Sequence, residues 1–414
     1  MKRFLALALL AACGDSSTVE IPEVRSDLER DLAPAVPAAD FARLVDDNTA
    51  FALDMYQLAR PSGANLFMSP HSVSIALAMT YAGASGATAT QLADALHFTL
   101  PEPQLHAAFD ALDLELMSRA AQATGDTIPF KLNTANALFG QTGWRFLPPF
   151  LDTLALNYGA GMRVLDFAAD PESARETING WVEDRTNDRI KDLLPQGSVT
   201  ESTRLVLANA IHFSAAWATP FETGATADSP FTLASGAAIT VPTLHQNAEL
   251  GYGEGAGFRA AELPYDGGQL AMVVIEPDDL GAFEDGFDVV QWQAVLASLQ
   301  PHQLELALPK FKFDAPLGLK DALIALGMTD AFTARADFSR IDGARDLMIT
   351  DVLHKGFVAI DEHGTEAAAA TAVIVGDTSA PGPATLAVDH PFLVVIRDRP
   401  TGAILFVGRV VDPR

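Results

Sequence analysis

The alternation of apolar and polar positions predicts several strands in the second half of the chain. Residues 205–213, LVLANAIHF, are apolar on both faces, as in a central strand, although this strand must bury Asn209. The leucines of LELALP (304–309) alternate, and LAMVVIEP (270–277) is a further apolar run. Residues 390–411 are typical of two strands joined by a turn that contains proline and glycine.

Helical patterns are concentrated in the first half of the chain. Ser69 followed by Pro70, and Asp170 followed by Pro171, place a capping side chain directly before a proline at the first helical position. The second helix has one apolar face, made by Ala174, Ile178, Trp181 and Val182. Helices followed by strands predict an α+β domain with large, mainly antiparallel sheets. No linker interrupts residues 40–414, which we expect to form one domain.

The N-terminus has the pattern of an export signal. Two basic residues precede a short apolar stretch that ends at Ala12, which is too short to span a bilayer. Residues 10–13, LAAC, resemble a bacterial lipobox. We therefore expect residues 1–12 to be removed and Cys13 to carry lipid. Residues 13–39, rich in Ser, Pro and acidic side chains, are predicted to form a flexible tether. The protein would then be lipid-anchored at a bacterial cell envelope or surface, with shedding into the extracellular space as an alternative.

Charge and cysteine content exclude several classes of function. The 414 residues carry a formal net charge of −26, so the positive surface that nucleic acid requires is lacking. Cys13 is the single cysteine, which rules out an intramolecular disulfide, and packing must supply the stability.

The familiar catalytic motifs are absent from the sequence. It contains no G-x-S-x-G, no H-E-x-x-H, no P-loop and no G-x-G-x-x-G. His354 lies in a strand-like stretch, where a lone histidine is more often a hydrogen-bonded core residue than a ligand. We therefore expect a binding protein rather than an enzyme, without a metal or an organic cofactor.

Residues 362–376, EHGTEAAAATAVIVG, contain an unusual run of small, uncharged side chains. If this stretch became a strand, its odd-numbered residues from Thr365 to Val375 would share one face, and all of them are small or β-branched. Insertion of a strand into a packed sheet selects such residues, because bulk costs about 1–3 kcal/mol per overpacked site. Alanine also favours helix, and composition leaves an exposed loop or helical turn equally open.

The order of motifs along the chain resembles that of the serpins, the serine protease inhibitor family. The resemblance rests on GTEAAAAT after FVAIDEH, on VDHPFLVVIRD, and on upstream stretches that include NLFMSPHSVSIALAMTYAGASGAT, LVLANAIHFSAAWATPF and LPKFKF. It covers residues 40–414. It implies a fold of three β-sheets and eight or nine helices with an exposed reactive-centre loop. A serine protease that attacks this loop would be trapped as an acyl-enzyme when the cleaved loop inserts into the main sheet.

The resemblance also assigns roles to individual residues. Thr378 and Ser379 match the scissile bond. Glu362 matches the hinge glutamate, and Lys310 matches its ion-pair partner. The remaining hinge positions are Gly364, Thr365, Glu366, Ala367, Ala368, Ala369 and Ala370. Serpins have a polar network beneath the central strands, called the shutter, which matches Asn65, Ser69, Ser72, Asn209 and His354. Trp217 matches the tryptophan of the breach, the region where insertion starts.

The composition of the loop restricts the target protease. No Lys or Arg occurs between Gly364 and Ile396, and no aromatic residue occurs between Gly364 and Pro391. Trypsin-like and chymotrypsin-like enzymes are therefore disfavoured, and elastase-like or subtilisin-like targets are expected. A carrier, chaperone or structural role without inhibition is the alternative. Residues 89–121, which match the heparin-binding region of some serpins, contain one Arg, so no heparin-like polyanion is expected, and we expect a monomer.

Overall fold

A computed structural model of the chain describes residues 21–122, 131–365 and 384–414. Ten α-helices and three short 3-10 helices lie in these ranges, against the eight or nine helices expected. The helices are α1 (Ala38–Ala59), α2 (Pro70–Tyr81), α3 (Gly86–Ala95), α4 (Glu102–Ser118), α5 (Pro148–Tyr158), α6 (Pro171–Arg185), α7 (Leu280–Asp285), α8 (Val289–Ser298), α9 (Lys320–Ala325) and α10 (Ser339–Asp342), with η1 (Arg119–Gln122), η2 (Thr223–Ala225) and η3 (Asp330–Phe332).

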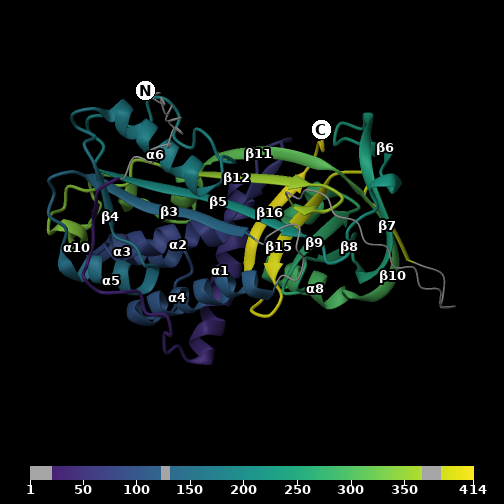
Figure 1. Cartoon of the computed structure of the whole chain (residues 1–414), viewed down its shortest axis with the longest axis horizontal. Helices are drawn as coiled ribbons and strands as arrows, with labels where there is room; N and C mark the ends of the chain where they lie inside the picture. Colours follow the sequence, from purple (N-terminus) through teal and green to yellow (C-terminus); the bar gives the residue numbers. More distant parts are fainter. Residues whose placement is uncertain (1–20, 123–130, 366–383) are drawn as a thin grey trace, which may run out of the picture.

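Seven strands form the sheet that carries the candidate site. In spatial order they are β1 (Glu23–Val24), β4 (Met162–Leu165), β3 (Lys131–Gln141), β5 (Leu205–Ala216), β13 (Gly364–Thr365), β12 (Val352–Ile360) and β11 (Phe311–Gly318). Helices α1 to α5 lie on one side of this sheet, and α6 lies on the other (Figure 1). The predicted central strand at 205–213 is confirmed as part of β5, and Asn209 is fully buried within it.

A second sheet has nine strands. Its order is β14 (Ala384–Ala387), β10 (Gln300–Pro309), β7 (Ala238–Gly255), β8 (Phe258–Pro264), β9 (Leu270–Pro277), β15 (Phe392–Asp398), β16 (Ile404–Val410) and β2 (Leu66–Met68), while β6 (Ala227–Thr232) also pairs with β7. The predictions for residues 270–277, 304–309 and the two C-terminal strands are confirmed.

The α+β class is confirmed, but hydrogen bonding within the described ranges connects the strands into two sheets instead of the expected three. The reason is the length of β7, which has 18 residues. Its first residues (238–243) pair with β6, its middle (243–252) pairs with β10, and its last residues (251–255) pair with β8. Strand β7 therefore joins into one sheet two groups of strands that would otherwise form separate sheets.

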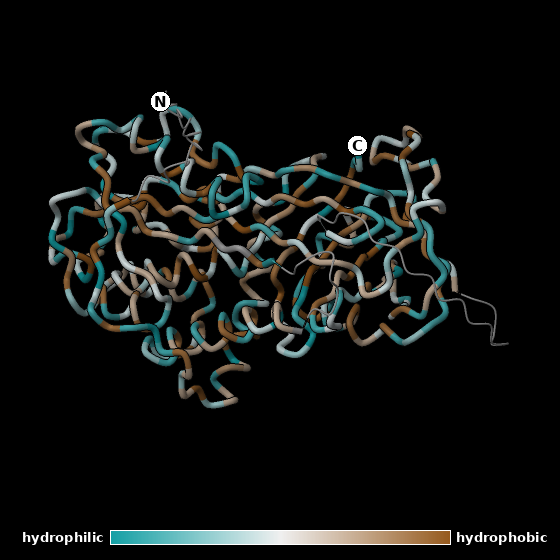
Figure 2. The backbone as a smooth tube through the Cα atoms, in the orientation of Figure 1, coloured by the Kyte–Doolittle hydropathy of each residue, from teal (hydrophilic) through white to brown (hydrophobic). Residues whose placement is uncertain are grey.

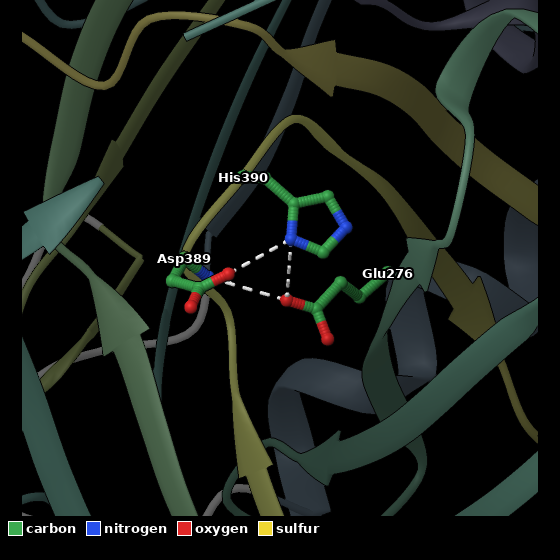
Figure 3. A group of neighbouring side chains, drawn as sticks. All are labelled: Glu276, Asp389 and His390. Carbon is green, nitrogen blue, oxygen red and sulfur yellow. Dashed lines mark hydrogen bonds and ion pairs between the residues drawn. The ribbon is translucent and has the colours of Figure 1, made fainter. Parts of the chain in front are cut away.

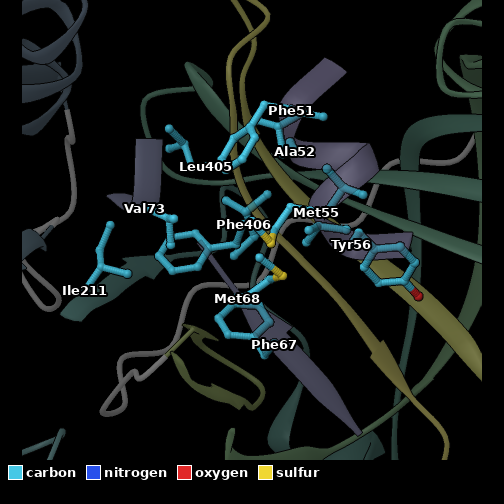
Figure 4. Close-up of a cluster of buried hydrophobic side chains, with 14 of the residues drawn as sticks. Phe51, Ala52, Met55, Tyr56, Phe67, Met68, Val73, Ile211, Leu405 and Phe406 are labelled. Atoms are coloured by element: carbon cyan, nitrogen blue, oxygen red, sulfur yellow. The ribbon is translucent and has the colours of Figure 1, made fainter. Parts of the chain in front are cut away.

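The core lies where helices α1 and α2 pack between the two sheets. Helix α2 is buried from Pro70 to Thr80, because the surrounding elements cover it on every side. Phe67 and Phe406 stack with their ring centroids 5.0 Å apart inside this cluster (Figure 4). Hydrophobic residues recur along the strands that cross the middle of the molecule (Figure 2). No helix in the described ranges is long and apolar enough to cross a bilayer.

Local signals in the sequence explain where two helices begin. The Ser69 hydroxyl accepts a hydrogen bond from the backbone N–H of Ser72, and the Asp170 carboxylate accepts one from Ser173. Both contacts cap the free N–H groups of a first helical turn. The predicted apolar face of α6 is confirmed, because it packs on the seven-stranded sheet through Ala174, Ile178, Trp181 and Val182.

The structure corrects part of the flexible segment expected at residues 13–39. Ile21 is buried, with 5% of its surface exposed, and β1 pairs with β4. The Arg30 guanidinium forms ion pairs with Asp110 at 2.7 Å and Asp113 at 2.6 Å. Residues 21–39 are thus held against the domain by apolar burial, strand pairing and charge. Cys13, the predicted signal peptide 1–12 and residues 14–20 lie outside the described residues.

Candidate functional site

The central strands of the seven-stranded sheet are in contact along one part of their length and parted along another. Strands β5 and β12 are parallel and pair directly where residues 207–211 lie opposite 352–356. Further along, β13 lies between them, antiparallel to both. Gly364 and Thr365 face Ala216 and Ala215 of β5, and Thr365 also faces Ile360 of β12. The beginning of the alanine-rich segment therefore already occupies a gap in the sheet.

A tight turn directs the chain from β12 into β13. The Asp361 carboxylate accepts hydrogen bonds from the backbone N–H groups of His363 (2.8 Å) and Gly364 (3.3 Å). A Cβ atom added to Gly364 would lie 2.1 Å from the carbonyl oxygen of Ala215. Glycine is required here because the backbone of β13 approaches β5 too closely for a side chain.

Aromatic side chains form a platform beneath the start of β13. Trp217 stacks on Tyr265 with ring centroids 4.7 Å apart, and its indole N–H donates to the Asp361 carbonyl at 3.0 Å. The hydroxyl groups of Tyr265 and Thr365 are hydrogen-bonded at 2.7 Å. Thr365 is 1% exposed, so its side chain points into the molecule. Trp217, predicted for this region, is in contact with the turn that leads into the segment.

The predicted ion pair between Lys310 and Glu362 is confirmed. The Lys310 ammonium donates to both carboxylate oxygens of Glu362, at 2.8 and 3.0 Å, and the Thr226 hydroxyl donates to one of them at 2.7 Å. Burial raises the pKa of Glu362, but the hydrogen bonds from Lys310 and Thr226 outweigh that effect and lower the pKa overall. The ion pair thus fixes the turn to Lys310, the residue between β10 and β11.

A polar network holds β5 and β12 together where they pair directly. His354 and Asn209 face each other across the ladder, and the His354 Nδ1 lies 2.5 Å from the Asn209 amide oxygen. The backbone N–H of Ser69 donates to His354 Nε2 at 3.0 Å. The Asn209 amide nitrogen donates to the Ser72 hydroxyl at 2.8 Å. Ser69, Ser72, Asn209 and His354 therefore lie together, as predicted.

The structure corrects the membership of this network at two positions. Asn136 of β3 belongs to it, because its amide oxygen accepts from Asn209 at 2.7 Å and from Ser72 at 2.9 Å. No sequence motif indicated this residue. Asn65 makes its hydrogen bonds elsewhere, to the backbone of Val411 and Asp412. Its position just before β2 directs its amide to the end of β16, away from His354.

The hydrogen bonds of His354 fix its neutral form. Because Nε2 accepts from the Ser69 N–H, the ring proton is on Nδ1 and is donated to Asn209. Burial lowers the pKa of His354 to about 3, since a charged ring is poorly solvated there. The predicted role of a hydrogen-bonded core histidine is confirmed by these contacts.

Acid should weaken the contact between β5 and β12 through His354. An unfolded histidine gains a proton below about pH 6.5, whereas folded His354 stays neutral down to about pH 3. The unfolded state then binds more protons, so stability falls with decreasing pH by about 1.4 kcal/mol per unit within this window. Between pH 7 and pH 5 the loss from this group should be about 2 kcal/mol.

Denaturant unfolding at pH 7 and pH 5 measures this effect, with His354→Gln compared with the unsubstituted chain. The variant should lose less stability on acidification, by about 2 kcal/mol. His302→Gln, at an exposed position of β10, is the matched control and should leave the pH dependence unchanged. Equal pH dependence in the His354 variant and the unsubstituted chain would show that His354 is not the acid-sensitive group.

Several predicted site residues lie outside the described residues. They are Glu366, Ala367, Ala368, Ala369, Ala370, Thr378 and Ser379. The described chain resumes at Ala384 with β14, which pairs in parallel with β10. The lone arginine of residues 89–121, Arg119, is ion-paired with Asp398 at 2.7 Å and Glu115 at 3.2 Å, so this region presents no free cationic patch in the described chain.

Comparisons with known proteins agree with this geometry. Residues 46–413 match the family described as Serpin (serine protease inhibitor). The leukocyte elastase inhibitor of Bos taurus is 39% identical over 380 residues, which cover 88% of this chain and 98% of the relative. That of Homo sapiens is 38% identical over 386 residues, with 90% and 100% covered.

Solved structures share the same fold. The native state of a thermophilic serpin, tengpin, superposes with a TM-score of 0.83 at 25% identity, covering 95% of this chain and all of that one. Uncleaved ovalbumin gives a TM-score of 0.79 at 27% identity, with 89% of this chain and all of that one covered. Because the family match extends over most of the chain and agrees with the observed fold, the protein belongs to the serpin family.

Proposed function

We propose that this protein inhibits serine proteases as a suicide substrate. A target protease would attack the segment between β13 and β14, and the cleaved N-terminal part would then extend β13 along the sheet. One observation supports this most strongly: β13 already begins a strand between β5 and β12, at the end where these two are parted. Farther along, β5 and β12 pair with each other, and an inserted strand would replace that contact.

The register of β13 makes the insertion specific. Thr365 lies opposite both Ala215 and Ile360. In antiparallel ladders each step forward on one strand matches one step back on the other. Six residues on, Thr371 would therefore lie between Asn209 and His354, which are now direct partners. Both neighbouring strands give the same position, so one continuous strand can pair with both of them.

The side chains of the segment suit the two environments it would enter. The Thr365 side chain points inward, so the odd-numbered residues from Ala367 to Val375 would point inward as well. All of them are small or β-branched and uncharged. The one charged side chain after Thr365 in this stretch, Glu366, would point outward. Insertion would thus bury neither bulk nor charge on the inner face.

Chemically, the trap is an interrupted proteolysis. The protease serine oxygen would attack the carbonyl carbon of Thr378, the peptide bond to Ser379 would break, and the new amino terminus would leave with the C-terminal fragment. The ester that remains would link the protease to Thr378. Residues 366–378 are the part of the segment that would still have to enter, and at ~3.3 Å per residue they would carry the linked protease roughly 40 Å along the sheet. Distortion of its active site would then prevent water from completing hydrolysis.

Elastase-like or subtilisin-like proteases are the proposed targets. The segment offers no basic or aromatic side chain for a trypsin-like or chymotrypsin-like pocket, but it has Val375, Thr378, Ser379 and Ala380 near the proposed bond. Two relatives of this chain are named leukocyte elastase inhibitors, which supports the same target class.

Denaturing gels test the proposed inhibition. The purified chain is incubated with pancreatic elastase, subtilisin or trypsin, and the products are analysed by mass spectrometry. We expect a covalent complex with elastase or subtilisin and release of a fragment that begins at Ser379. Trypsin, which finds no basic residue in the segment, should give no complex. Cleavage by all suitable proteases without any complex would refute inhibition and favour a carrier, chaperone or structural role.

We also propose that the protein acts at a bacterial cell surface, as the lipobox-like sequence before Cys13 suggests. In this arrangement the inhibitor would protect the cell envelope from secreted proteases. Metabolic labelling with a fatty acid should mark the unsubstituted chain but not Cys13→Ser. Equal labelling of both proteins, or labelling of neither, would refute the anchor without affecting the proposed inhibition.

A further inference from the structure

Three side chains that could bind a metal ion meet beside the strand that follows the reactive segment. Glu276 lies near the end of β9, and Asp389 and His390 lie in the connection between β14 and β15 (Figure 3). One potential ligand atom from each residue lies within 4.8 Å of the others. Glu276 lies more than 100 residues before Asp389 and His390 in the sequence, so only the fold reveals the group.

The three ligand atoms converge on one point from two sides. His390 Nδ1 lies 2.9 Å from a carboxylate oxygen of Asp389 and 3.3 Å from Oε1 of Glu276. The Glu276 side chain is completely buried, whereas the side chain of Asp389 is 61% exposed. The group thus has a fixed carboxylate on its inner side and an opening to solvent on its outer side.

The second ring nitrogen of His390 determines what can occupy that point. Nε2 lies 2.9 Å from the Pro277 carbonyl oxygen. A carbonyl can only accept, so Nε2 carries a hydrogen and donates it. In the neutral ring, the Nδ1 lone pair then faces two carboxylate oxygens. Three acceptors that face one another are stable only with a proton or a metal ion among them, and the proton can be on Nδ1 or on a carboxylate oxygen.

This arrangement is also the one that orients a metal-binding histidine. Such histidines commonly donate the other ring N–H to a carboxylate or a backbone carbonyl, as His390 does to Pro277. The Arg259 guanidinium occupies only one of the two carboxylate oxygens of Glu276, so the other can bind a metal ion. Arg259 pairs with Oε2 of Glu276 at 2.6 Å, while Oε1 faces His390. The backbone N–H of Asp389 also points to Oε1, at 3.2 Å.

We propose that Glu276, Asp389 and His390 form a binding site for a divalent transition metal ion such as Zn²⁺. One imidazole nitrogen and two carboxylate oxygens are ligands that zinc accepts, and the opening to solvent leaves a place for water. A bound ion would join the β14–β15 connection to β9. Because β14 directly follows the reactive segment, the ion would hold the C-terminal end of that segment while its N-terminal end moves. Metal binding itself does not depend on the proposed inhibition.

Calorimetric titration of the purified, chelator-treated chain with ZnCl₂ at pH 7.5 tests the site. We expect one Zn²⁺ per chain and a higher unfolding temperature when Zn²⁺ is present, because the ion binds the folded state. Glu276→Gln, Asp389→Asn and His390→Gln should each weaken binding at least ~10-fold, as loss of metal-site partners does. His302→Gln removes an exposed histidine outside the group and should bind like the unsubstituted chain.

The unfolding temperature of each variant in the presence of chelator controls for misfolding. Asp389→Asn is the variant least expected to disturb folding, because the Asp389 side chain is largely exposed. Absence of saturable Zn²⁺ binding to the unsubstituted chain would overturn the proposal. The proposal would also be overturned if the folded Asp389 and His390 variants bound Zn²⁺ as tightly as the unsubstituted chain, since the ion would then bind elsewhere.

Discussion

Replacement of Ala367 by arginine is expected to convert the protein from an inhibitor into a substrate. In the inserted strand, residue 367 would lie opposite Phe213 and Val358, which are 1% and 0% exposed. A guanidinium group at this position would be buried without a partner, and the cost is several kcal/mol. Each 1.4 kcal/mol slows a step about tenfold. Insertion should therefore lose the competition with hydrolysis of the acyl-enzyme.

The measurement is the number of inhibitor molecules consumed per elastase molecule inactivated. Ala367→Arg should raise this number at least ~100-fold for about 3 kcal/mol on the insertion step. Glu366→Arg is the matched control, because the side chain of residue 366 would point outward, between Ser214 of β5 and half-buried Ala359 of β12, and Glu366 itself already carries a charge there. The control should inhibit nearly as well as the unsubstituted chain. Equal effects of the two substitutions would contradict the proposed register.

Cleavage of the reactive segment is expected to increase heat stability strongly. An extension of β13 by residues 366–373 would complete the ladders with both β5 and β12, while the direct pairs between these strands are lost. A net gain of about ten hydrogen bonds at ~0.5–1.5 kcal/mol each corresponds to roughly 5–15 kcal/mol. For a domain of this size, the unfolding temperature should rise on the order of 10 °C or more.

Calorimetry before and after limited digestion with thermolysin measures this change. Thermolysin uses zinc rather than a serine nucleophile, so no acyl-enzyme complicates the comparison. The Ala367→Arg variant should gain much less stability on cleavage than the unsubstituted chain. An unchanged unfolding temperature after complete cleavage would show that the segment does not enter the sheet.

The parts of the site that are close in sequence or have strong local signals could be predicted. Capping by Ser69 and the largely apolar strand around Asn209 each have a local physical cause. The pairing of Lys310 with Glu362 followed from the resemblance, because no property of the two residues alone relates them. The structure adds the Thr226 hydroxyl as a third partner.

Features that depend on the register between distant strands could not be predicted from the sequence. Asn136 joins the polar network because β3 places it opposite Asn209. Glu276 meets His390 because β9 and β15 are neighbours in one sheet. The buried position of Ile21 likewise depends on β1 pairing with β4. In each case the polar or apolar character of the residue was visible, but its partner was determined by tertiary structure.

The crystal structure of the chain after cleavage in the reactive segment tests the central claim most directly. The account predicts that residues 366–373 form a strand between β5 and β12, with Thr371 between Asn209 and His354 and with the hydrogen bond between those two side chains broken. If β5 and β12 remain paired at residues 207–211 and 352–356 in the cleaved chain, as they are in the intact one, the insertion mechanism is contradicted.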